Sequence, residues 1–416
     1  MTTSNRIPRR AALKLGAATG AAALAGGRVR AQTPKAVEVA VLAPMTGPWA
    51  RTGQMKLSGA QMAVDEINSA GGIKALGGAK MELVVYDAGD STEKAADAAK
   101  RMVAQHPDLI GGSGAWLSSF TLAVTEVTER AEIPWLTLSY SDAITDRGFR
   151  YIFQMSPTAD QQALVAIPVY IDLAKQATGK APETIAVIAD NTASEVSFLK
   201  PVRAFELKDN HLNLVADETF TPPLTDATTI VQHVRSGRPQ LLLLPMSVIG
   251  DMKLILDKCN EYHLGADRLP KMGMGGQLGA PELAQTIGLD IVQGLLVLVA
   301  NWPGKGQEEI NRRFMERTKE PWLNQDAFMT YIDMMILKEA LERAGVADRR
   351  KVAEVMRGFD LHDEGPAKFI PSRHLKFDSR GRLVDAQLVI IQWQNGAPKP
   401  IYPPNVATAE AIWPKG

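Results

Sequence analysis

The stretch Asp108-Leu-Ile-Gly-Gly-Ser-Gly-Ala-Trp-Leu-Ser-Ser-Phe120 predicts the end of a buried strand, a glycine turn and the start of a helix. Leu109–Gly111 forms the apolar strand end, and the glycines that follow would let the backbone turn tightly. Ser118 or Ser119 is a good N-cap for a helix whose apolar residues recur at i, i+3, i+4 and i+7 from Phe120. A helix that begins there offers its free N–H groups to an anion such as a carboxylate.

A second bend of the same kind follows the next predicted strand. Pro134–Leu138 is apolar, and Ser139, Tyr140 and Ser141 come directly after it. Because neighbouring parallel strands end at the same edge of a sheet, the two serine-bearing bends would line one polar cleft. The alternative is that these are ordinary loop serines and helix caps.

The first 31 residues resemble an export signal. Arg9-Arg10 precedes a weakly apolar run from Leu15 to Gly27, which is shorter than the ~20 residues that a membrane span needs. Small residues at Val29 and Ala31 predict cleavage before Gln32. The pattern is closest to a twin-arginine signal. Ala12 departs from that pattern, so export by the general secretory route stays open.

Removal of residues 1–31 would leave a mildly acidic protein of 385 residues, which predicts two domains. That segment carries six basic and no acidic residues, so 40 basic and 46 acidic residues remain, with a net charge of −6. This charge argues against nucleic acid or an anionic membrane as a partner. Cys259 is the only cysteine, which excludes an intramolecular disulfide.

Strand-like and helix-like segments alternate in two blocks, which predicts an α/β fold with two parallel sheets and helices on both faces of each. In the C-terminal part, His374–Phe377 and Asp385–Trp393 would form a hairpin joined through Asp378–Gly381. The proline-rich tail from Pro398 to Pro414 would lie on the surface. The other predicted strands are 37–43, 81–87, 184–190, 212–219, 241–244 and 271–275.

Two motifs resemble a known family. Val41-Leu-Ala-Pro-Met-Thr-Gly47 and Ala63-Val-Asp-Glu-Ile-Asn-Ser-Ala-Gly-Gly-Ile73 are similar to the opening of type I periplasmic substrate-binding proteins. They are most similar to the leucine/isoleucine/valine-binding branch, which serves ABC importers. The resemblance covers nearly all of the mature chain. It implies two Rossmann-like lobes joined by three crossovers, with a small carboxylate-bearing solute held between the lobes by hinge closure.

The resemblance also implies where the lobes begin and end, and which partners the protein has. Residues 36–155 and 303–370 would form the N-terminal lobe, and 156–302 and 371–416 the C-terminal lobe with the tail. The crossovers would fall near Gln154–Pro157, Val299–Pro303 and Phe369–Arg373. We expect a periplasmic monomer that delivers its solute to an inner-membrane ABC permease and needs no cofactor.

The family's binding site can be carried over to this chain residue by residue. The turn that includes Ser118 would bind the solute's carboxylate, and the turn at Ser139 would supply a carbonyl and a hydroxyl to an α-amino group. A loop after Asp190 would close over the ligand from the second lobe. The complete predicted site is Trp49, Trp116, Leu117, Ser118, Ser119, Ser139, Tyr140, Ser141, Asn191, Thr192, Gly275 and Gly276.

Two departures from the family's pattern leave the solute open. Gly275-Gly276-Gln277 stands where amino-acid binders usually place an acidic residue, although Glu195 or Asp142 could pair with an ammonium instead. The aromatic residue expected in the closing loop is also missing. An unpaired ammonium loses a charge-assisted hydrogen bond worth roughly 1.5–3 kcal/mol. Trp49 and Trp116 would suit an aromatic acid by stacking, unless they only pack locally. A small amide or urea is a third possibility.

Other functions find less support in the sequence. Gly111–Ala115 is one glycine short of the G-x-S-x-G elbow of serine hydrolases, and no histidine has a strand-end context, so we predict that the protein is not an enzyme. His362-Asp363-Glu364 lacks the spacing of metal ligands, so we predict no metal site. A protein that presents its ligand to a membrane receptor remains the alternative among binding functions.

Overall fold

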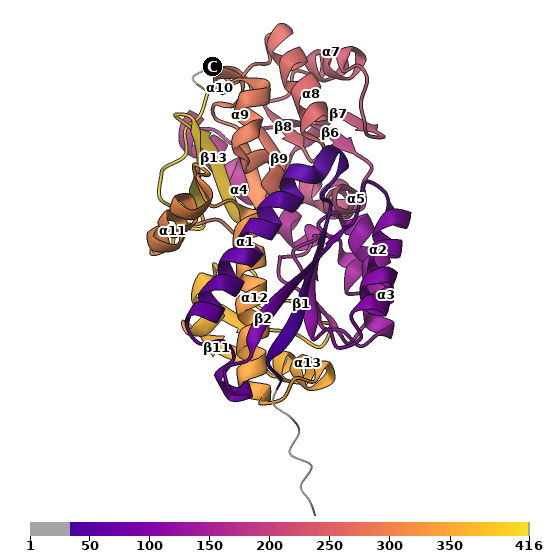
Figure 1. Ribbon diagram of the computed structural model, residues 1–416. Coiled ribbons are helices and arrows are strands. Elements are labelled where there is room, and N and C mark those ends of the chain that lie inside the picture. Colours follow the sequence, from indigo (N-terminus) through magenta and orange to yellow (C-terminus); the bar gives the residue numbers. More distant parts are fainter. Residues whose placement is uncertain (1–33, 415–416) are drawn as a thin grey trace, which may run out of the picture. The chain divides into compact units, whose positions relative to one another are not determined.

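A computed structural model describes residues 34–414; the predicted export signal, residues 1–31, lies outside them. Two parallel-dominated sheets organise the described chain (Figure 1), which confirms the predicted fold class. The first sheet has five parallel strands in the order β2-β1-β3-β4-β5. Its elements are β1 (Ala36–Ala43), α1 (Ala50–Ser69), β2 (Lys80–Asp87), α2 (Thr92–Gln105), β3 (Gly111–Gly114), α3 (Ser118–Arg130), β4 (Trp135–Thr137) and β5 (Ile152–Gln154).

Alternating side chains of β1 enter two apolar cores on opposite faces of this sheet. Val39 and Val41 belong to the core that includes α1 and a later helix, α12 (Gln325–Ala344). Ala40 and Leu42 belong to the core beneath α2 and α3. Both faces are therefore covered, as two-sided apolar strands require.

The glycines of the opening stretch form a strand rather than the predicted turn. Gly111–Gly114 is β3, which pairs with β1 on one side and β4 on the other. A Cβ atom on Gly112 would lie 2.5 Å from the ring of Trp135, and one on Gly114 would lie 1.9 Å from the carbonyl oxygen of Leu42. The glycines are needed for close packing in the sheet, and the bend begins only at Ala115.

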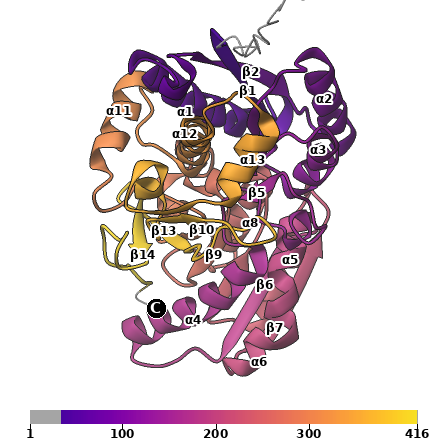
Figure 2. The same ribbon diagram turned by 90° about the horizontal axis from the view of Figure 1, so that it is seen from below.

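The second sheet has seven strands in the order β14-β13-β10-β9-β8-β6-β7, and only β13 and β14 run antiparallel to their neighbours. Figure 2 shows β13 and β14 beside β10. Its elements are α4 (Ala159–Thr178), β6 (Thr184–Asp190), α5 (Ala193–Pro201), a π-helical turn (Val202–Glu206), α6 (Leu207–Asp209), β7 (Asn213–Phe220), α7 (Thr228–Gly237), β8 (Leu241–Leu244), α8 (Ile249–Glu261), β9 (Lys271–Met274), α9 (Pro281–Ile287), α10 (Leu289–Val292), β10 (Leu296–Val299), β13 (Val389–Gln394) and β14 (Ala397–Tyr402).

After β10 the chain returns to the first sheet. Helix α12 packs against α1, and Gly59 permits the close approach, because a Cβ there would lie 1.9 Å from the carbonyl oxygen of Ala327. The remaining elements of this segment are α11 (Glu308–Thr318), α13 (Arg349–Arg357), β11 (Asp360–His362) and β12 (His374–Lys376).

The predicted C-terminal hairpin is wrong in its pairing. Strand β12 pairs with β11, whereas β13 pairs with β10 and with β14, a strand in the segment that we expected to be surface tail. Pro398 and Pro400 disguise β14 in the sequence, because proline is tolerated on an edge strand but not in a central one.

The lobe boundaries remain a proposal, and the strand pairing leads us to propose a later position for the last boundary. Arg382 forms a parallel bridge with Gln154 of the first sheet, and Gly381 accepts a hydrogen bond from the same glutamine. We therefore propose that the third crossing lies between Leu383 and Val389, later than the expected Phe369–Arg373.

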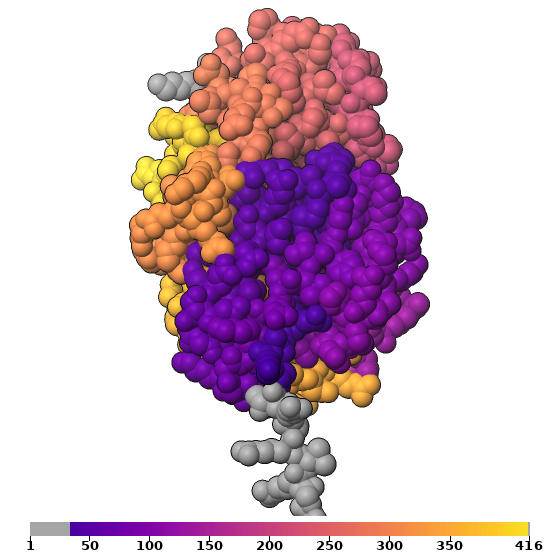
Figure 3. All heavy atoms as spheres, in the orientation of Figure 1, coloured from indigo at the N-terminus to yellow at the C-terminus, as the bar shows by residue number. Residues whose placement is uncertain are grey.

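The two sheets meet across direct contacts. Arg51 of α1 forms an ion pair of 2.5 Å with Glu282 of α9, and the hydroxyls of Ser141 and Ser197 are 3.1 Å apart. On the face in Figure 3, the indigo and purple atoms of the N-terminal part meet the salmon and orange atoms of the middle of the chain along a seam. Among the described helices, none combines the length and the apolar character that crossing a membrane demands.

Candidate functional site

The two serine-bearing bends meet, as the strand order predicts. The backbone N–H of Ser141 donates to the hydroxyl of Ser118 at 3.1 Å. The Ser139 hydroxyl donates to the carbonyl of Trp116 at 2.6 Å and contacts the hydroxyl of Thr121 at 2.7 Å. Ser139 is thereby used to hold the bends together, while Ser118 keeps a hydroxyl proton that no described residue accepts.

Ser118 is the first residue of α3 and not its N-cap. The cap position is Leu117, whose apolar side chain forms no hydrogen bond with the helix. The prediction failed because the Ser118 hydroxyl turns to the neighbouring bend instead of to its own helix. The first N–H groups of α3 consequently lack a side-chain cap and are directed toward whatever lies before the helix. Trp116, just before it, has a φ of 84°, a conformation that is unusual for a bulky residue.

A small cavity lies where these bends face the second sheet. Its volume of about 30 Å³ holds one or two water molecules, so a solute of amino-acid size requires the walls to separate. Seven of the twelve predicted site residues line it, from both sheets: Trp116, Leu117, Ser118, Ser139, Tyr140, Gly275 and Gly276.

The other five predicted residues do not line this cavity. Ser141 supports Ser118, and Ser119 is half-buried beside it. Trp49 packs its ring against Phe120 and borders a second cavity of about 30 Å³, which shares the walls Ser247 and Gln277. In the loop after Asp190, the amide of Asn191 donates to Thr221 and the hydroxyl of Thr192 to Asp190.

Sequence reasoning missed the contribution of α12. The side-chain oxygen of Gln325 accepts from the Tyr140 hydroxyl at 2.8 Å and from the Ala300 N–H at 2.5 Å, which fixes the amide in place. Its amino group is buried without a partner among the described residues, and so are both carboxylate oxygens of Asp326. Buried polar groups are rarely left without a hydrogen bond, so we propose these atoms as candidates for contact with a ligand.

Gly276 provides the space next to those unpaired atoms. A Cβ at this position would lie 2.7 Å from the amide nitrogen of Gln325 and 3.0 Å from a carboxylate oxygen of Asp326. The second sheet thus approaches α12 through a residue without a side chain. The Asp326 carboxylate therefore approaches Gly276 from α12, on the opposite side of this space.

The second lobe also supplies a carboxylate, that of Glu195 in the first turn of α5. It accepts a hydrogen bond from the hydroxyl of Ser194, contacts the hydroxyl of Thr192 and lines the cavity. Burial, together with the charge of Asp190, raises the pKa of Glu195 to about 7. Asp142, the other acidic residue considered for an ammonium, lies by Asp160 and outside the cavity lining.

Replacement of Glu195 by glutamine is expected to stabilise the protein more at pH 8 than at pH 5. The folded-state pKa of about 7 exceeds the ordinary value of 4.5. The stability that the protonated Glu195 side chain contributes is therefore fully present below pH 4.5 and is lost as the pH rises through 7. In urea unfolding, the advantage of the variant over the parent in free energy of unfolding should be roughly 1–3 kcal/mol larger at pH 8 than at pH 5. Asp290→Asn, on an exposed residue, is the control; an equal gain at both pH values would contradict the assignment.

Comparisons with known proteins agree with this architecture. A family model described as periplasmic binding protein matches residues 36–397. The Leu/Ile/Val-binding protein homolog 7 of Brucella suis is 26% identical over 390 residues, which cover 91% of this chain and 94% of that protein.

Solved structures share the fold at low identity. A branched-chain amino acid transporter substrate-binding protein from Streptococcus pneumoniae, in complex with isoleucine, is 19% identical with a TM-score of 0.74, covering 91% of this chain and all of the other. A solute-binding protein from R. palustris, in complex with benzoate, is 15% identical with a TM-score of 0.71, covering 91% and 98%. The family match extends over most of the chain, and its members are solute-binding components of transporters rather than enzymes. The protein belongs to the periplasmic binding protein family.

Proposed function

We propose that this protein captures a small carboxylate-bearing solute, a branched-chain or related amino acid, and delivers it to an inner-membrane ABC permease. The observation that carries the proposal is that Ser118, at the amino end of α3, and Glu195 line the same cavity. The helix end and the hydroxyl suit the solute's carboxylate. Glu195 suits its ammonium, in place of the acidic residue missing at Gly275–Gln277, and Asp326, which lines the second cavity, offers another carboxylate once the walls separate.

Hinge opening and closure would give the solute access. The cavity of about 30 Å³ is too small for an amino acid, and its walls come from both sheets. The Arg51–Glu282 ion pair and the Ser141–Ser197 contact are the bonds that opening would break. The solute would bind first to the Ser118 bend, and the second lobe would then close over it.

An aromatic acid is the second candidate, supported by Trp116 in the cavity wall and by the benzoate complex of the relative from R. palustris. A thermal-shift screen of branched-chain amino acids, benzoate and urea separates the classes, since only bound solutes raise the melting temperature by mass action. Glu195→Gln should then lower the affinity for an amino acid but leave the affinity for benzoate unchanged or higher. A ligand-presenting sensor on the same fold is the alternative, and a permease-dependent uptake assay distinguishes it.

Ser118→Ala is expected to lower the affinity for the identified solute by about tenfold or more, because a hydrogen bond to a charged group contributes about 1.5–3 kcal/mol. Isothermal titration of the variant measures this loss. Ser119→Ala, at the adjacent half-buried residue outside the cavity lining, is the matched control. Unchanged affinity in Ser118→Ala would remove Ser118 from the site.

Export would precede this function. We propose that residues 1–31 are removed before Gln32 and that the mature protein works as a periplasmic monomer. Amino-terminal sequencing of the exported protein tests the cleavage position, and a mature chain that begins elsewhere would overturn it.

A further inference from the structure

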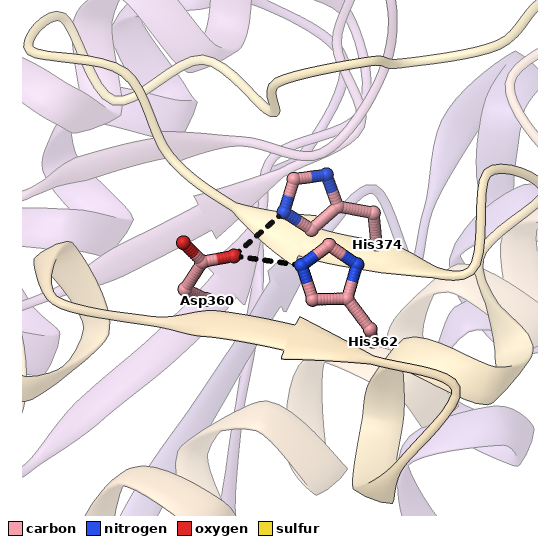
Figure 4. A group of neighbouring side chains, drawn as sticks. All are labelled: Asp360, His362 and His374. Atoms are coloured by element: carbon pink, nitrogen blue, oxygen red, sulfur yellow. Dashed lines mark hydrogen bonds and ion pairs between the residues drawn. The ribbon is translucent and has the colours of Figure 1, made fainter.

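A group of two histidines and one aspartate lies on the small β11–β12 sheet, outside the cavity lining described above. The two strands are antiparallel, with His362 opposite His374 and Asp360 opposite Lys376. The two histidines are twelve positions apart in the chain, which is why no ligand spacing is visible in the sequence. Figure 4 shows both imidazoles directed toward the same carboxylate.

The three side chains present their ligand atoms to one point. Oδ1 of Asp360 lies 3.0 Å from Nε2 of His362 and 2.9 Å from Nε2 of His374. The two rings are stacked with centroids 4.0 Å apart and planes inclined by 15°, and both Nε2 atoms contact the same oxygen of Asp360. All three ligand atoms lie within 4.8 Å of one another, a separation that one metal ion can span.

A second carboxylate orients the more buried histidine. Oδ2 of Asp385 lies 3.0 Å from Nδ1 of His374. Carboxylates in this outer position hold a metal-binding imidazole in the tautomer that leaves Nε2 free for the metal. Lys376 contacts the other oxygen of Asp360, Oδ2, at 2.7 Å, which leaves Oδ1 facing the histidines.

We propose that His362, His374 and Asp360 bind one divalent transition-metal ion of the zinc class. Two imidazole nitrogens and one carboxylate oxygen suit such an ion, whereas Ca²⁺ and Mg²⁺ prefer oxygen ligands alone. Water would complete the coordination. His362 has 65% of its side chain exposed and Asp360 49%, so the ion can enter from solvent without any movement of the solute-binding walls.

Isothermal titration of Zn²⁺ into the purified protein, produced without a histidine tag, tests the proposal. We expect one ion per chain, with binding lost in His362→Gln and in His374→Gln. Asp385→Asn should weaken binding about 10- to 100-fold, because Asp385 acts by positioning His374. His263→Asn is the control, since His263 is exposed, lies outside the group and has a positive φ that asparagine tolerates.

Titration with Co²⁺ adds a second measurement, because the visible absorption of the bound ion reports its coordination directly. Visible absorption bands of low-symmetry cobalt should appear in the parent and in His263→Asn but not in the two glutamine variants. The proposal fails if the parent shows no saturable Zn²⁺ binding, if both glutamine variants bind as the parent does, or if His263→Asn loses binding equally. In those cases the group is an ion-pair network only.

Discussion

Gly276→Val is expected to lower the affinity for the solute by roughly 100-fold. The side chain would enter the space between the second sheet and α12, where even a Cβ lies 2.7 Å from Gln325 and 3.0 Å from Asp326. Valine would displace the solute from the unpaired amide and carboxylate groups and would also hold the two walls apart. The closed form therefore becomes inaccessible, while the separated form accommodates the side chain.

Titration of a size series separates this effect from general damage. Gly276→Ala should lose less affinity than Gly276→Val. Gly250→Ala should lose none, because Gly250 is exposed and a Cβ there meets no atom closer than 3.9 Å. Gly276 has no positive φ, so the substitution adds no backbone strain of its own. Parent-like affinity in Gly276→Val would mean that the solute does not occupy this space.

The part of the site that follows strand ends could be predicted from the sequence. Ser118 follows β3 after the bend at Ala115–Leu117, and the Ser139–Ser141 bend follows β4. Parallel topology brings the ends of these two neighbouring strands together. Local pattern also predicted the alternation of strands and helices. These inferences need only the period of apolar residues and the chain order.

The contribution of α12 could not be found in this way. Gln325 and Asp326 are 185 and 186 residues beyond Tyr140 in the chain, and nothing local marks them as site residues. Only the folded structure shows that Gln325 bonds Tyr140 and that no described residue forms a hydrogen bond with the Asp326 carboxylate. An acid is missing near Gly276, and the sequence does not show that the Asp326 carboxylate of α12 approaches this glycine in the fold.

The predicted pairing of the C-terminal strands was wrong for a related reason. His374–Lys376 has the composition of a hairpin strand, yet its partner precedes it in the chain, at Asp360–His362. Periodicity identifies a strand but does not identify its neighbour, because pairing depends on which apolar faces the rest of the fold leaves uncovered. The same limit concealed the proposed metal site at Asp360, His362 and His374.

Lys56→Met is expected to destabilise the folded protein by about 3–5 kcal/mol at pH 8, because it leaves buried carboxylates without a compensating charge. Lys56 is 1% exposed and donates to Thr330 at 3.2 Å, and Asp326 and Asp333 are fully buried near it. Burial raises the pKa of both carboxyls to about 6, against the opposing charge of Lys56. Without the lysine their pKa values would rise further, so the loss should shrink as the pH falls below 6 and both groups become neutral.

Urea unfolding at pH 8 and pH 5 measures this loss, with Lys175→Met on the exposed face of α4 as the control. Adding Asp333→Asn to Lys56→Met should recover part of the stability at pH 8. Asparagine removes one buried charge and still accepts from Ser113, whose hydroxyl lies 2.6 Å from the Asp333 carboxylate. If Lys56→Met costs no more than Lys175→Met, the three groups are not coupled. A loss as large as expected means that Lys56 compensates these buried charges, and in the proposed function the charge that Asp326 offers to a solute's ammonium would then depend on this lysine.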